Sequence, residues 1–186
     1  MHGVSHNGVI LALAVIGKEN EPLFMKTYRG DSKDGLVRGY RERDGTGTNS
    51  STGESTSADS EYLSLQFHIH TSLDIVDEKV ASGGRRVYPN NRDLYIGQLF
   101  TIEDYNLFGY VSNSRIKFIV LIEGTQANNT IKTWMRELHD VYIKATANPF
   151  LELMPHAHGL ATTSFHKQVD QRVAAFNRKA QGTTNF

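Results

Sequence analysis

Histidines are the residues of this sequence best suited to metal binding, and they gather in two places. His68 and His70 lie two positions apart in a segment with helical periodicity, so they are predicted to point to different sides of a helix. His156 and His158 lie near His166 in a predicted loop-to-helix region, where a zinc site is conceivable, but no closed set of four ligands with the usual zinc spacing accompanies them. The sequence therefore predicts no bound metal and no cofactor.

Acid–base chemistry is suggested only by the adjacent His139 and Asp140, which the helical pattern places on or near the polar side of a helix. There is no Gly-x-Ser-x-Gly nucleophile elbow, and no Walker A motif occurs. Gly45 and Gly47 lie in a low-complexity stretch, so they do not form a phosphate-binding turn. The chain has no cysteine, which removes thiolate chemistry and disulfides. We therefore predict that the protein is not an enzyme.

Composition indicates a protein that works among other proteins. The 186 residues include 20 lysines and arginines and 20 aspartates and glutamates, and no basic stripe is interleaved with aromatic residues. This balance gives no support to nucleic acid or an anionic membrane as the main partner. The apolar run Val9–Ile16 is shorter than the ~20 residues that span a bilayer. No basic residue precedes it, so we expect no signal peptide.

Hydrophobic periodicity predicts five strands and three helices in the order β-β-α-β-β-β-α-α, an α/β (α+β) class of fold. Residues 30–59 are predicted to be a flexible low-complexity insertion in a single domain of residues 1–186. Short turns are expected at 103–106 and 113–115, and the apolar run 119–122 predicts a central last strand. The predicted strands are Val9–Ile16, 22–28, 94–100, 107–112 and 116–123, and the predicted helices are 60–82, 129–147 and 164–179.

Two of the predicted helices show an apolar stripe that faces a core. Ser164 is predicted to cap the last helix, because serine oxygens accept hydrogen bonds from free backbone N–H groups. The stripe of the second helix comprises Ile131, Trp134, Met135, Leu138, Val141, Tyr142 and Ala145, and that of the third comprises Phe165, Val169, Val173 and Phe176.

The first predicted helix carries apolar residues on two sides, and Gly83-Gly84 is predicted to end it. Two interpretations of its outer side stay open. Either the helix starts later than residue 60 or a loop covers Leu63 and Phe67, or this side binds a partner. The inner stripe is Tyr62, Leu65, Ile69, Leu73, Val76 and Val80, whereas the outer side is Leu63, Phe67, His70, Thr71, Asp74 and Glu78.

Three segments together resemble the sedlin-related small subunits of TRAPP vesicle-tethering complexes. They are AVIGKENEPL at 14–23, HTSLDIVDEK at 70–79 and the meander at 93–123. The Lys18-Glu19-Asn20 turn and the Thr-Ser before Leu73 are similar to the subunit 2-like branch of this family. The resemblance implies a longin-like (SNARE-like) fold, with a five-stranded antiparallel sheet that carries one helix on one face and two on the other.

The resemblance also implies a role. Such a chain would be a non-catalytic adaptor that joins a small core subunit to a large complex-specific subunit in ER–Golgi and Golgi vesicle transport. Rab-family GTPases would be served indirectly, through exchange by the complex, from a cytoplasmic site peripheral to Golgi and ER–Golgi membranes. Asp74 matches the family's helix aspartate at the large-subunit contact. The alternative is a stand-alone longin-domain regulator that binds a SNARE or a Rab directly.

Overall fold

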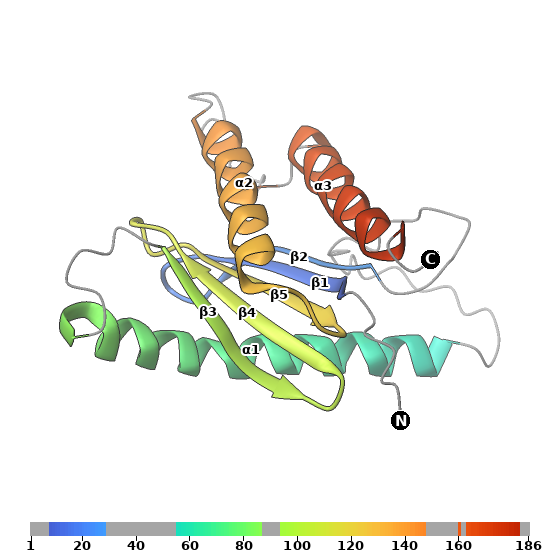
Figure 1. Cartoon of the computed structure of the whole chain (residues 1–186), viewed down its shortest axis with the longest axis horizontal. Helices are drawn as coiled ribbons and strands as arrows, with labels where there is room; N and C mark the ends of the chain where they lie inside the picture. Colours follow the sequence, from blue (N-terminus) through green and yellow to red (C-terminus); the bar gives the residue numbers. More distant parts are fainter. Residues whose placement is uncertain (1–7, 29–54, 87–93, 148–159, 161–162, 183–186) are drawn as a thin grey trace, which may run out of the picture.

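A computed structural model describes residues 8–28, 55–86, 94–147, 160 and 163–182 of the chain (Figure 1). Its order of elements is the predicted one, β-β-α-β-β-β-α-α. The strands are β1 (Val9–Ile16), β2 (Pro22–Thr27), β3 (Tyr95–Ile102), β4 (Tyr105–Val111) and β5 (Lys117–Glu123), and the helices are α1 (Ser55–Arg86), α2 (Asn128–Thr146) and α3 (Thr163–Gly182).

The strands form one antiparallel sheet in the order β2-β1-β5-β4-β3 (Figure 1). β1 and β2 pair as a hairpin, and β3, β4 and β5 form the predicted meander. β5 is the middle strand, between β1 and β4. Its nearly continuous apolar sequence is buried on both faces, as a central strand covered on both sides requires.

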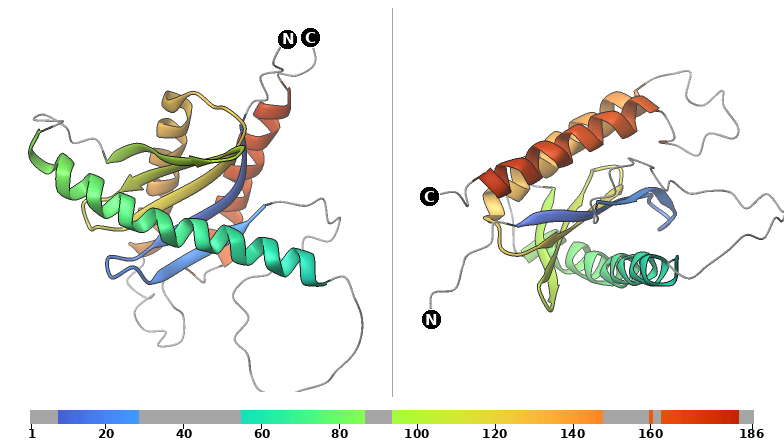
Figure 2. Two further views of the ribbon diagram at one scale, coloured as in Figure 1. Left: turned by 90° about the horizontal axis from the view of Figure 1, so that it is seen from below. Right: turned by 90° about the vertical axis from the view of Figure 1, so that its right-hand side faces the viewer.

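One helix covers one face of the sheet and two helices cover the other, which confirms the expected longin-like layers (Figure 2). Because successive side chains of a strand point to opposite faces, β5 contributes to both cores. Phe118, Val120 and Ile122 pack under α2 and α3. Ile119 and Leu121 pack under α1. The sheet therefore holds two separate hydrophobic cores together.

The stripes predicted for α2 and α3 are confirmed, because each faces the sheet. Tyr142 and Ala145 are half-buried at the end of the α2 stripe. α3 begins at Thr163, so the prediction of Ser164 as its N-cap is wrong. The buried members are Ile131, Trp134, Met135, Leu138 and Val141 on α2, and Phe165, Val169, Val173 and Phe176 on α3.

The first helix is longer than predicted at both ends. α1 starts at Ser55, so the last five residues of the predicted insertion are helical, and residues 30–54 lie outside the described part. α1 also passes through Gly83-Gly84 to Arg86, so the predicted glycine stop is wrong. Glycine inside a helix costs only ~1 kcal/mol relative to alanine, which the rest of the helix can offset.

The turn between β3 and β4 is shorter than predicted. It comprises only Glu103 and Asp104, and Glu103 takes a positive φ of 50°. Asn106, predicted in the turn, pairs with Thr101 across the two strands. Its side chain donates to the carbonyl of Gly124 at 2.8 Å and so ties the hairpin to the end of β5. Residues 103–106 have the composition of a turn, so the sequence did not indicate the hydrogen bond between Asn106 and Gly124.

His139 was predicted on a solvated face, and this is wrong, whereas Asp140 is exposed as predicted. The imidazole is half-buried among the rings of Tyr110, Phe118 and Tyr142, with ring centroids 5.3, 5.7 and 6.5 Å away. Its Nδ1 lies 3.0 Å from the hydroxyl of Tyr110. Burial lowers the pKa of His139, so this histidine serves as a packed aromatic residue between the sheet and α2.

We expect Trp134→Ala to lower the free energy of unfolding by ~3–5 kcal/mol, because it removes a buried side chain that packs edge-on against Phe176. Denaturant titration measures this loss. Thr133→Ala on the exposed side of the same helix is the control, expected within ~0.5 kcal/mol of the wild type. A loss below ~1 kcal/mol for Trp134→Ala would contradict the packing of α2.

Candidate protein interface

α1 is attached to the sheet along a narrow stripe. Ile69, Leu73 and Val76 are buried against the alanines of β1 and the apolar residues of β5. Ser72 is also buried, and its hydroxyl donates to the carbonyl of Ile69 at 2.6 Å, which keeps a polar group satisfied beneath the helix. Of the predicted inner stripe, Tyr62 and Leu65 have side chains outside the described part of the structure.

An ion pair between a buried lysine and a half-exposed aspartate holds α1 against the sheet. Lys117, at the start of β5, is only 5 % exposed. Its ammonium donates to Oδ1 of Asp77 on α1 and to Oδ1 of Asn20 in the β1–β2 turn, both at 2.6 Å. A buried ammonium needs such partners, because an unpaired one is strongly destabilising. Helix, turn and central strand are thus held at one point.

The conformation of the β1–β2 turn places the side chain of Asn20 beside the ammonium of Lys117. The N–H of Gly17 donates to the carbonyl of Glu21 at 2.8 Å, which closes the turn. Asn20 adopts a left-handed backbone with φ of 66°, a conformation that asparagine tolerates better than most residues. A β-carbon on Gly17 would lie 1.9 Å from a carboxylate oxygen of Glu21, so a larger residue there would require this flexible side chain to move. The Gly-Lys-Glu-Asn sequence therefore positions the amide that accepts from Lys117.

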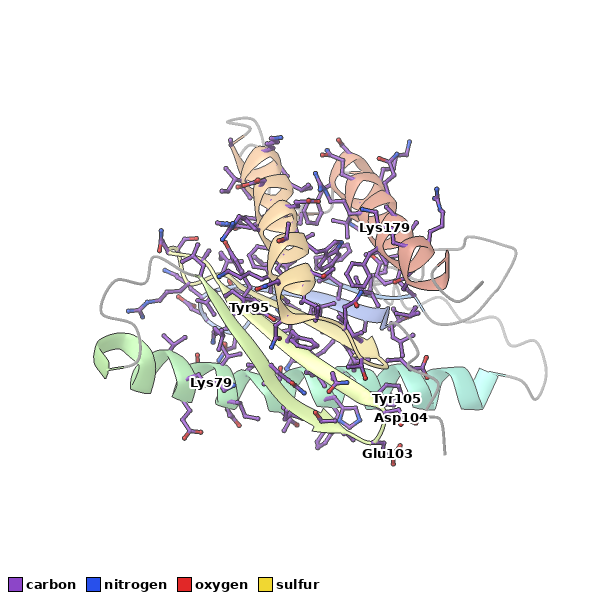
Figure 3. The ribbon with its side chains drawn as sticks, viewed as in Figure 1. Lys79, Tyr95, Glu103, Asp104, Tyr105 and Lys179 are labelled. Atoms are coloured by element: carbon purple, nitrogen blue, oxygen red, sulfur yellow. The ribbon has the colours of Figure 1, made fainter. Side chains whose placement is uncertain are left out.

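α1 is attached again near its C-terminal end, where the sheet stops. The Lys79 ammonium donates to the backbone carbonyl of Gln98 on β3, the edge strand (Figure 3 labels Lys79). Val80 was predicted in the inner stripe, but it is 47 % exposed. The C-terminal end of α1 extends past the strands in Figure 2. The predicted role of Val80 as an anchor is wrong.

The outer side of α1 brings together the six residues that the sequence singled out. All six side chains are exposed, and they follow one side of the helix away from the sheet. Leu63 is 62 % exposed and Phe67 is 67 % exposed, which is high for large apolar side chains on a well-packed helix. We call this set the α1 outer face: Leu63, Phe67, His70, Thr71, Asp74 and Glu78.

The alternatives left open for this face are partly resolved. A helix start later than residue 60 is wrong, because α1 begins at Ser55 and both Leu63 and Phe67 are helical. The second idea, a covering loop, involves residues outside the described part of the chain. Within the part that is described, nothing buries the two side chains. The role of the α1 outer face in binding stays a prediction.

The histidines in the described part of the chain do not come together into a site. His68 lies 3.4 Å from the hydroxyl of Ser64, while His70 is exposed on the outer face. His166 packs edge-on against Phe24 at a centroid distance of 5.0 Å. His156 and His158 lie outside the described residues. No group of three His, Asp or Glu side chains able to hold a metal occurs among the described residues.

Comparison with known proteins decides the family. A family model described as Sedlin matches residues 15–175, from β1 to α3. The chain belongs to the sedlin family. The matched range includes Asn20, Asp77 and Lys117 and the whole of α1.

Relatives of this sedlin-family chain carry informative names. The mouse "Trafficking protein particle complex subunit 2-like protein" is 33 % identical over 143 residues, covering 75 % of this chain and 81 % of the mouse protein. The Dictyostelium discoideum protein of the same name is 29 % identical over 143 residues, covering 76 % and 81 %. The Schizosaccharomyces pombe "Transport protein particle 20 kDa subunit" is 31 % identical over 87 residues, covering 47 % and 57 %.

The residues that hold α1 in place were not predicted from the sequence. Asn20, Asp77 and Lys117 lie inside the three segments that resemble the family, and no sequence pattern assigns them a role. One signal was available, since Lys117 is a charged residue that opens an apolar strand buried on both faces. A lysine in such a position usually has a carboxylate partner. Spacing alone, however, does not show which acid of α1 that partner is.

We expect Asp77→Asn to lower the free energy of unfolding by ~1–3 kcal/mol, because the buried ammonium of Lys117 loses its anionic partner. The expected loss is kept modest because the Asp77 side chain is 52 % exposed. Urea titration measures it. Asp74→Asn, one turn away on the outer face, is the matched control and should change stability by less than ~0.5 kcal/mol. Equal effects of the two changes would show that the ion pair does not stabilise the fold.

Proposed function

We propose that this sedlin-family chain is a non-catalytic adaptor subunit of a trafficking protein particle complex, with the α1 outer face as its docking surface for another subunit. Support comes from the family match across residues 15–175 and from the names of the relatives. In this proposal the whole chain acts as one domain. The partner on α1 is a large complex-specific subunit, and a small core subunit binds elsewhere.

The observation that carries the proposal is the exposure of Leu63 and Phe67 on a helix whose rotation is fixed. An exposed aromatic side chain beside polar groups is typical of a protein-binding hot spot, because its burial releases much apolar surface. The ion pair of Asp77 with Lys117 keeps α1 from rolling and hiding these side chains against the sheet. The face is therefore available in a single orientation, which lowers the entropic cost of binding.

The cellular setting follows from the same proposal. The chain would act at the cytoplasmic side of Golgi and ER–Golgi membranes and reach them through its complex. It would serve a Rab-family GTPase indirectly, with nucleotide exchange performed by other subunits. Among the described helices, none has the length and apolar character that a membrane span requires.

The proposal is tested by replacing Phe67 and Asp74 together with alanine in the tagged full chain. Both side chains are exposed, so we expect an unchanged melting temperature. Co-purification of a large complex subunit should fall by about tenfold, as expected from loss of ~1–2 kcal/mol at a hot spot. Quantitative mass spectrometry of the purified complex measures this ratio.

The matched control replaces Ile143 and Asp140 with alanine. This pair also combines an exposed aliphatic residue with an exposed aspartate, but it lies on α2, across the sheet from α1. Co-purification of the large subunit should be unaffected by this change. Retention of the large subunit by the Phe67/Asp74 double variant would remove α1 as its docking surface. Binding of a purified Rab or SNARE to the isolated chain would favour the stand-alone regulator instead.

A further inference from the structure

Three side chains of the α1 outer face lie almost in one line along the helix. Because each residue of an α-helix turns by about 100°, Leu63, Phe67 and Asp74 fall within about 40° of one another. Asp74 lies about 10 Å along the helix axis from Phe67, at a rise of about 1.5 Å per residue. All three side chains are exposed. The outer face therefore presents an apolar end, followed by a carboxylate about two turns further on.

The charge of Asp74 is not neutralised by its own chain. Asp74 has no hydrogen bond or ion pair within the part of the chain that the structure describes. Its neighbour Asp77 differs, because that carboxylate pairs with Lys117 at 2.6 Å. Lys79 is the one lysine of α1, and its ammonium donates to the carbonyl of Gln98 on the sheet. The six residues of the α1 outer face include no lysine or arginine, so the charge of Asp74 is open to a partner.

A partner that covers Phe67 also covers Asp74. A stable interface buries about 800 Å² on each side, which is a patch of about 16 Å radius if it is round. Centred on Phe67, such a patch extends beyond Asp74. A carboxylate covered by apolar or acidic groups would lose its hydration without compensation, at a large cost in free energy. The covering surface therefore needs a cation opposite Asp74.

We propose that the α1 outer face docks on a surface of a partner protein that has an apolar hollow for Leu63 and Phe67 and, about 10 Å from Phe67, an arginine or lysine that pairs with Asp74. This inference rests on the docking role proposed for α1 and adds the chemistry of the partner. It defines what the partner must present: an exposed apolar hollow and one basic side chain at a fixed distance from it.

Two other occupants of this face fit its charge less well. An anionic phospholipid surface attracts helices with basic residues beside the apolar ones, whereas this face carries a carboxylate. A second copy of the chain, docked through the same face, would bring no lysine or arginine to Asp74. A basic surface of a different protein satisfies both the apolar side chains and the carboxylate.

Four variants of the tagged full chain separate the charge from the apolar contact. The readout is the amount of large complex subunit retained per tagged chain, measured by quantitative mass spectrometry. Asp74→Asn keeps the size of the side chain and removes its charge, so retention should fall about fivefold. Asp74→Lys should lower retention more than about tenfold, because like charges then meet. Asp74→Glu keeps the charge and should stay within about twofold of the wild type. Phe67→Ala removes the apolar contact alone. Melting temperatures should not change, since both positions are exposed.

The dependence of retention on salt is the second readout. Retention by the wild type should decrease as ionic strength rises, since ions screen the pair of Asp74 with its cation. Retention by Asp74→Asn should be less sensitive to salt than retention by Phe67→Ala, which keeps the charge. The matched control is Asp140→Lys, which reverses an exposed aspartate on α2, across the sheet from α1, and should leave retention unchanged.

The outcomes distinguish this inference from the docking role on which it rests. If Phe67→Ala lowers retention while Asp74→Asn and Asp74→Lys do not, α1 docks but no cation faces Asp74, and the inference is wrong. Equal salt dependence of the wild type and Asp74→Asn would contradict it in the same way. If none of these variants lowers retention, the docking role of α1 fails as well. If the purified chain binds vesicles of anionic phospholipid, and Asp74→Lys strengthens this binding while Phe67→Ala abolishes it, the face binds a membrane and the inference is overturned.

Discussion

The ammonium of Lys117 holds three distant parts of the chain together. It is buried at the start of the central strand and is satisfied by Asp77 of α1 and Asn20 of the β1–β2 turn. The segments that carry these three residues are the same segments that resemble the sedlin family: the turn, the helix motif and the meander. Because removal of one partner leaves a buried charge, the contact favours a single arrangement of helix on sheet.

This arrangement fixes which side of α1 faces away from the sheet. The apolar stripe that attaches α1 is narrow, with Ile69, Leu73 and Val76 as its buried members. Such a stripe alone would allow the helix to roll, whereas the ion pair and the contact of Lys79 with Gln98 do not. The exposed apolar residues of the α1 outer face are therefore a stable feature of the surface, which the proposed docking role requires.

The neutral composition of the chain conceals a division of charge between its two sides. Twenty basic and twenty acidic residues cancel over the whole sequence, which argued for no charged partner. The fold places a net positive charge on the α2–α3 side and a net negative charge on α1. Net charge describes solubility and says nothing about such a separation.

Hydrophobic periodicity predicted the features that depend on the local sequence. It failed for side chains whose burial depends on residues far away in the sequence. The order of elements, the central position of β5 and the inner residues of α2 followed from apolar patterns. Val80 has the right phase but is largely exposed, so the same pattern gave a wrong anchor. His139 looked solvated on a helical wheel, yet Tyr110 and Phe118 from the sheet surround it.

The central claim, that another subunit covers the α1 outer face, is tested most directly by photo-crosslinking from position 67. A benzophenone amino acid replaces Phe67 in the tagged chain, the assembled complex is purified and irradiated, and the adducts are mapped by mass spectrometry. The account predicts covalent adducts to a different subunit. Adducts confined to this chain's own residues 30–54 would show that the chain covers this face itself, and that result would contradict the account.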